Sequence, residues 1–63
     1  MHLHQRHNEI SATYVHNGRF IDVQRSPDGW AGTEVSPDGL VGVLLAVSTS
    51  ERETLEAVIA AFA

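Results

Sequence analysis

The chain has 63 residues and no cysteine, and its formal net charge is −4, with eight acidic side chains against four arginines and no lysine. A chain of this length forms one small domain, which buries only about 60% of its unfolded surface and usually depends on disulfides, a metal or oligomerisation for stability. The composition excludes disulfides and thiolate metal sites, and its acidic balance argues against nucleic acid and anionic membranes as partners.

No segment of the sequence has the features of a targeting or membrane-spanning element. Residues 1–7 lack the apolar run of about 7–15 residues that a signal peptide requires. The longest apolar run, residues 40–47, is far shorter than the roughly 20 residues that span a bilayer as a helix. We therefore expect a cytoplasmic protein with no membrane partner.

Residues 1–9 contain three of the four histidines and show no regular period. We expect them to form a flexible, His-rich arm, followed by a single small domain over residues 10–63. In an extended arm His2 and His4 would point the same way, and His7 or His16 would add a third nitrogen, a set that suits zinc or another transition metal. The competing interpretation is a solvated arm that binds added metal adventitiously.

Residues 10–25 are typical of a β-hairpin, because Asn17-Gly18 is the preferred dipeptide of a two-residue turn. This turn sets a register in which both strands agree on one apolar face, made of Ile10, Ala12, Tyr14, Ile21 and Val23. In the same register His16 lies opposite Arg19. Val15 and Phe20 then form an apolar pair on the other face, which is either an ordinary cross-strand contact or a site for a partner.

A short repeat follows, in which Ser26-Pro27-Asp28-Gly29 recurs as Ser36-Pro37-Asp38-Gly39. Each copy predicts a tight turn, because proline presets φ and glycine accepts a positive φ. One aspartate per turn supplies too few ligands for a calcium loop. The segment between them, residues 30–35, is expected to be a strand, and its Trp30 is either a core ring or an interface anchor.

Residues 40–47 form the longest apolar run, Leu-Val-Gly-Val-Leu-Leu-Ala-Val. The run does not alternate with polar residues, so a strand here would be covered on both faces. A chain this short has little material to cover two faces, so we expect a second copy to do so, most simply in a homodimer. The side chains expected at partner interfaces are Val15, Phe20, Trp30, Val41, Val43, Leu45 and Phe62.

The last element is predicted to be a helix. Ser50-Glu51-Arg52-Glu53 fits a capping box, and Arg52 can pair with Glu56 one turn later. An apolar stripe follows at helical spacing, formed by Leu55, Val58, Ile59 and Phe62. The expected fold class is therefore α+β, a four-stranded antiparallel meander with one C-terminal helix packed on one face.

The layout of residues 37–62, a Pro-Asp-Gly turn, an apolar strand and a Ser-capped acidic helix, resembles that of the small actinobacterial BldB-like proteins. Those proteins are encoded beside helix-turn-helix regulators, so the resemblance implies a regulatory partner. The chain departs from the family in lacking the proline and tryptophan expected near the start of the helix and the charged strand expected before the turn.

No pattern in the sequence assembles catalytic chemistry. Cysteine is absent, no serine lies in a nucleophile elbow, and Asp22, Asp28, Glu34 and Asp38 fall in turns or on the polar face. We therefore predict a small, non-enzymatic interaction or regulatory module that acts as a homo-oligomer, with no catalytic or cofactor-binding residues. The alternative is a metal- or small-ligand-binding protein that uses the N-terminal histidines, and a third possibility is an enzyme whose site spans a dimer interface.

Overall fold

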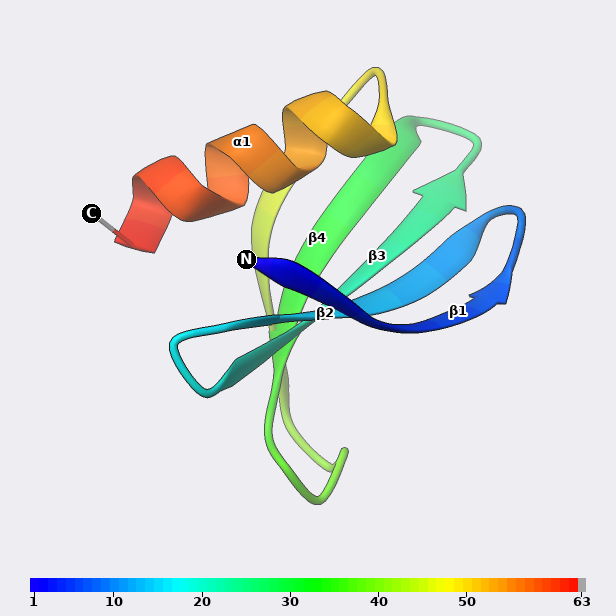
Figure 1. Ribbon diagram of the computed structural model, residues 1–63. Helices are drawn as coiled ribbons and strands as arrows, with labels where there is room; N and C mark the ends of the chain where they lie inside the picture. Colours follow the sequence, from blue (N-terminus) through cyan, green and yellow to red (C-terminus); the bar gives the residue numbers. More distant parts are fainter. Residues whose placement is uncertain (63) are drawn as a thin grey trace.

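The computed structural model describes residues 1–62, and Ala63 lies outside the described residues. Five strands precede one helix: β1 (His2–Asn8), β2 (Ser11–His16), β3 (Arg19–Ser26), β4 (Gly29–Val35), β5 (Gly42–Ser48) and α1 (Glu51–Phe62). The strands form one antiparallel sheet in chain order, so β1 and β5 are its two edges, and α1 crosses one face (Figure 1). The fold is α+β, as expected, but the sheet has five strands rather than four.

The additional strand is β1, which forms from the segment that was expected to be an irregular arm. It pairs with β2, and its register shifts twice, between Leu3 and Gln5 and between Arg6 and Asn8. Each shift leaves one residue of β1 without a paired residue on β2, so the side chains of β1 do not alternate regularly between the two faces of the sheet. For this reason the sequence of β1 shows no two-residue alternation of apolar and polar side chains.

The β2–β3 hairpin has the predicted turn and register. Asn17 and Gly18 adopt φ values of 51° and 77°, the positive values that a two-residue turn of this type requires. His16 lies opposite Arg19, and Ala12, Ile21 and Val23 are fully buried. Both Ser-Pro-Asp-Gly segments also connect consecutive antiparallel strands, as predicted.

The helix begins at the predicted cap, where Ser50 Oγ accepts a hydrogen bond of 3.1 Å from the Glu53 amide. Its buried contacts with the sheet are made by Val58 and Thr54, whereas Ile59, expected on the apolar stripe, is 40% exposed. The Thr54 hydroxyl lies 3.1 Å from the Trp30 carbonyl oxygen and 2.9 Å from that of Ser50. This buried threonine therefore joins the first turn of α1 to β4 without an unpaired polar group.

A bulge in β5 directs two consecutive residues toward the helix. Gly32 lies opposite Ala46 and Thr33 lies opposite Leu44, so Leu45 is the extra residue. Leu45 and Ala46 both pack against the buried core beneath α1. The far end of α1 is held by Phe62, whose ring stacks on His16 at 5.9 Å and lies 3.8 Å below the Arg19 guanidinium.

Candidate interaction surface

The large apolar side chains that residues 1–62 expose are concentrated on β5 and the loop before it. Five of the eight lie between residues 40 and 47, and their exposed fractions are 83%, 62%, 56%, 61% and 51% for Leu40, Val41, Val43, Leu44 and Val47. We call these five side chains the β5 surface. The structure therefore leaves uncovered, within one copy, most of the run that was expected to be covered on both faces, all but Leu45 and Ala46 among its large or half-buried side chains.

The backbone of β5 also offers unpaired hydrogen-bonding groups, because β5 pairs with β4 alone. The Ser36 amide donates to the Val41 carbonyl at 2.9 Å, and the Val41 amide donates to Ser36 Oγ at 3.1 Å. In an antiparallel ladder, consecutive residues direct their amide and carbonyl groups to opposite sides. The amide and carbonyl groups of Gly42 and Leu44 therefore point to the free edge of the sheet.

The two edges of the sheet differ in character. Isolated sheet edges are usually protected from pairing by charges, bulges or short strands. The β1 edge carries Arg6, three histidines and two register shifts. The β5 edge has one bulge but no charged residue anywhere from residue 39 to residue 50. Of the two, β5 is the edge suited to a partner.

A shallow hollow of about 380 Å³ adjoins the β5 surface, lined by Gly18, Arg19, Phe20, Glu34, Val35, Ser36, Pro37, Val41 and Val43. The loop beside it is ordered by its own polar contacts, because Asp38 accepts hydrogen bonds from the Ser36 hydroxyl and from the Leu40 amide, the latter at 3.0 Å. These two hydrogen bonds, of which the one from Ser36 has the larger effect, lower the pKa of Asp38 below its usual range. The loop therefore holds Leu40 in solvent with a fixed backbone.

The seven predicted interface residues fall into three groups. Val41 and Val43 belong to the β5 surface. Val15 and Phe20 lie opposite each other, half-buried, on the face of the sheet away from α1, which we call the open face. The rings or side chains of Trp30, Leu45 and Phe62 pack against the core. Leu40, Leu44 and Val47 are also exposed and lie in the same apolar run, although they are not among the seven predicted residues.

The predicted metal-binding histidines lie along β1, and two of them have partners on the open face. His4 meets Phe20 edge-on, with ring centroids 5.6 Å apart. His7 Nε2 lies 2.8 Å from Thr13 Oγ1, and the Thr13 hydroxyl donates a hydrogen bond of 2.7 Å to Asp22. Because the single hydroxyl proton of Thr13 is directed to Asp22, His7 Nε2 acts as the hydrogen-bond donor to Thr13. Within the described residues, no three histidine or acidic side chains are grouped so that they could hold a metal ion. Metal binding by His2, His4 and His7 stays a prediction.

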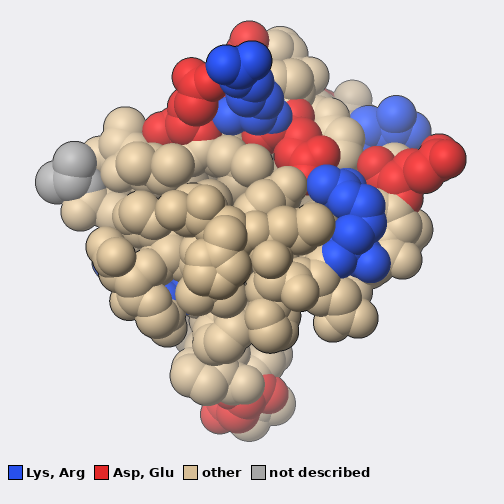
Figure 2. Space-filling model, viewed as in Figure 1, with Lys and Arg blue, Asp and Glu red and all other residues tan. Residues whose placement is uncertain are grey.

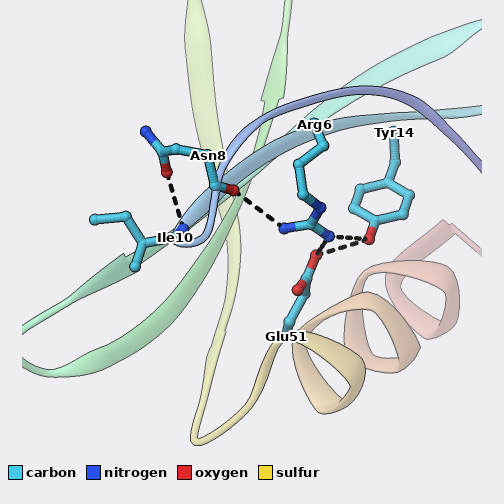
Figure 3. A network of polar contacts seen from close by, with 5 residues as sticks. All are labelled: Arg6, Asn8, Ile10, Tyr14 and Glu51. Carbon is cyan, nitrogen blue, oxygen red and sulfur yellow. Dashed lines mark hydrogen bonds and ion pairs between the residues drawn. The ribbon is translucent and has the colours of Figure 1, made fainter.

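A polar network ties β1 and β2 to the start of α1 (Figure 3). Glu51 Oε1 accepts hydrogen bonds of 2.7 Å from both the Tyr14 hydroxyl and the Arg6 guanidinium. Arg6 also donates to the Tyr14 oxygen at 3.3 Å and to the Asn8 carbonyl at 3.4 Å. Because every member finds its partner inside the chain, we interpret this network as structural.

The network shifts the titration of both acidic members. Burial by itself would raise the pKa of Glu51, but the hydrogen bonds from Tyr14 and Arg6 and the charge of Arg6 outweigh it, so the pKa is held below the ordinary 4.5. Burial, and then the carboxylate of Glu51, raise the pKa of Tyr14. Since the folded state favours ionised Glu51, its contribution to stability is complete above the unfolded pKa and is lost as the pH falls through the folded one.

Replacement of Glu51 by glutamine is therefore expected to lower the free energy of unfolding by about 1 kcal/mol at neutral pH, since a charged hydrogen-bond acceptor is lost. The difference between variant and wild type should shrink as the pH falls from about 4.5, the ordinary value, through the lower pKa of folded Glu51, where the wild-type carboxylate also becomes neutral. Urea unfolding followed by circular dichroism at several pH values measures this difference.

The matched control is Glu56→Gln, which removes the partner of Arg52 on the exposed side of the same helix. That ion pair has side chains 90% and 67% exposed, so its loss should change stability by only a few tenths of a kcal/mol at any pH. A constant difference between Glu51→Gln and wild type down to acidic pH would contradict the role given to Glu51.

Charged side chains lie mainly around the periphery of the face that carries α1. Figure 2 shows them along the upper rim, over the start of the helix and the nearby turns, and at the tip of the loop between β4 and β5. The centre of this face is uncharged. The five side chains of the β5 surface carry no charge, so they do not themselves bring like charges of two copies together.

Comparisons with protein-family models, with curated proteins and with solved structures find no match. Within residues 1–62, no helix combines the length and the apolar character that crossing a membrane requires. The function therefore has to be inferred from the surface of this chain itself, and the feature that stands out on it is the β5 surface.

Proposed function

We propose that this chain is a small, non-enzymatic interaction module that acts as a homo-oligomer and associates through the β5 surface. One observation carries the proposal: five exposed apolar side chains lie in an uncharged segment at an unpaired sheet edge. Several large apolar side chains exposed close together in this way usually mark an interaction site. A module built in this way would present two copies of its open face to a further, regulatory partner.

The energetics favour self-association over solvent exposure of this segment. Burying a valine or leucine side chain completely contributes about 1.5–3 kcal/mol, and each copy brings five that are at least half exposed. Part of that gain offsets the lost freedom of two independent molecules. The formal charge of −4 on each copy opposes contact through charged surfaces, but the β5 surface contains none of those charges.

The proposal predicts that Leu44→Glu abolishes self-association. The wild type should sediment as a dimer or larger oligomer at micromolar concentration, and the variant as a monomer, with association weakened more than about 100-fold, because a carboxylate cannot be buried without a partner. Analytical ultracentrifugation measures the masses. Circular dichroism checks that the fold is retained, which the 61% exposure of Leu44 leads us to expect.

Gln24→Glu is the matched control, because it adds the same charge to an exposed position of β3, away from β5. This variant should sediment like the wild type. A wild-type chain that remains monomeric at these concentrations, or a Leu44→Glu variant that associates as strongly as the control, would refute the proposal.

A further inference from the structure

We propose that two copies join in antiparallel pairing centred on Gly42, over the segment Leu40–Leu44, which comprises the first three residues of β5 and the two residues before it, so that the two sheets become one. This inference rests on the proposed function, since it specifies how the self-association is made. It is carried by three properties of that segment: its sequence symmetry, the direction of its backbone groups and its position relative to the bulge.

The segment reads Leu-Val-Gly-Val-Leu, the same in both directions. An interface with a twofold axis is self-complementary, so that where residue i contacts residue j, j also contacts i. Antiparallel pairing about Gly42 places Gly42 opposite its own copy, Val41 opposite Val43 of the other copy, and Leu40 opposite Leu44. Every position therefore meets a residue of its own kind.

The free amide and carbonyl groups of the segment lie where this register needs them. Gly42 and Leu44 direct their amides and carbonyls to the free edge, as the bonds between Ser36 and Val41 imply. Gly42 can then exchange two hydrogen bonds with its own copy, and the Leu44 amide can donate to the Leu40 carbonyl on each side. The Leu40 amide is already used by Asp38. Four new backbone bonds result, and the intervening Val41–Val43 pairs are non-hydrogen-bonded.

The bulge explains why the pairing ends at Leu44. Beyond it, Leu45 and Ala46 both face the core, so the alternation of side chains that a neighbouring strand needs is interrupted. The segment before the bulge contains the four most exposed large apolar side chains of the described residues, those of Leu40, Val41, Val43 and Leu44. A centre on Gly42 therefore pairs the most exposed residues and leaves the bulge outside the ladder.

Disulfide cross-linking tests the register, because the natural chain contains no cysteine. Residues opposite each other in a non-hydrogen-bonded pair have Cα atoms about 4.5 Å apart, which a disulfide can span. We would mix Val41→Cys labelled with ¹⁵N and unlabelled Val43→Cys, oxidise the mixture gently and count the products by mass spectrometry. The Val41–Val43 heterodimer should exceed either homodimer roughly tenfold, because only that pair lies within disulfide reach.

The matched control replaces Val43→Cys by Val47→Cys, whose side chain is comparably exposed and belongs to the same surface. In the proposed register residue 47 lies beyond the paired segment, so the heterodimer should not be enriched. An enriched heterodimer with Val47→Cys, or a statistical mixture of products with Val43→Cys, would overturn the register. The proposed function would still stand if the wild type sedimented as a dimer in the ultracentrifuge. A monomeric wild type would overturn both.

Discussion

Replacement of Ile21 by alanine is expected to lower the free energy of unfolding by about 2–5 kcal/mol, the usual cost of truncating a buried isoleucine. Ile21 is completely buried at the centre of β3, in one cluster with Val23 and Val58. A chain of this size has a total stability of roughly 3–9 kcal/mol. The variant should therefore lose a large fraction of its total stability, and its midpoint in urea, measured by circular dichroism, should fall accordingly.

This measurement is best made in the Leu44→Glu background, so that self-association does not add to the stability. The control in the same background is Val47→Ala, which shortens a side chain that is 51% exposed. Its cost should stay within about 0.5 kcal/mol, as for most surface substitutions. A loss below about 1 kcal/mol for Ile21→Ala would show that Ile21 is not at the centre of the core.

Replacement of Gly32 by alanine should cost about 1–3 kcal/mol, the range for overpacking a close-packed interior. Gly32 lies on β4 directly beneath α1, where an added Cβ would come within 2.8 Å of Val58 Cγ2 and 3.0 Å of Thr54 Cγ2. Both neighbours are short, β-branched side chains on a helix, which have little freedom to turn away. The helix would have to move outward, and it would lose contact with the sheet.

A double-mutant cycle distinguishes this clash from a general preference for glycine. Val58→Ala is destabilising alone because it leaves a cavity, but it also removes the atom that the new Cβ would meet. The double variant Gly32→Ala/Val58→Ala should therefore be more stable than the sum of the two single effects predicts, by about 1 kcal/mol. Strict additivity in urea unfolding would mean that the two residues do not approach each other as described.

The parts of the fold that were predicted from the sequence are those encoded locally. Asn17-Gly18 determines a turn, the turn determines a register, and two strands that independently agree on one apolar face confirm it. The cap at Ser50 and the pair of Arg52 with Glu56 are likewise contacts within one turn of helix. The strand β1 was missed because its two register shifts remove the period by which a strand is recognised.

The orientation of α1 could not be read from its own sequence. Helical spacing places Leu55, Val58, Ile59 and Phe62 on one stripe, but the residue that becomes buried beside Val58 is Thr54. The reason lies in the sheet and not in the helix. Gly32 on β4 has no side chain, and Val58 and Thr54 of α1 pack over the space that this leaves. Such a fit depends on two elements at once and has no signature in either.

The β5 surface was half predicted. The apolar run contains five of the exposed large apolar side chains of residues 1–62, Val41 and Val43 among them, but an interface at these residues stays a prediction. Leu45 was expected at the interface but faces the core, because the bulge rotates it inward and leaves Leu44 outside. A bulge depends on the pairing between strands, so a count of apolar residues does not reveal which of two neighbouring leucines is exposed.

The contrast between the two edges of the sheet would limit how far the proposed assembly could proceed. If two copies join through β5, the only strands left at the margins of the combined ten-stranded sheet are the two β1 strands. Each carries an arginine, three histidines and two bulges, features that discourage further strands from adding. The assembly would then end at two copies, and an apolar strand that could otherwise seed fibre growth would be enclosed within a finite particle.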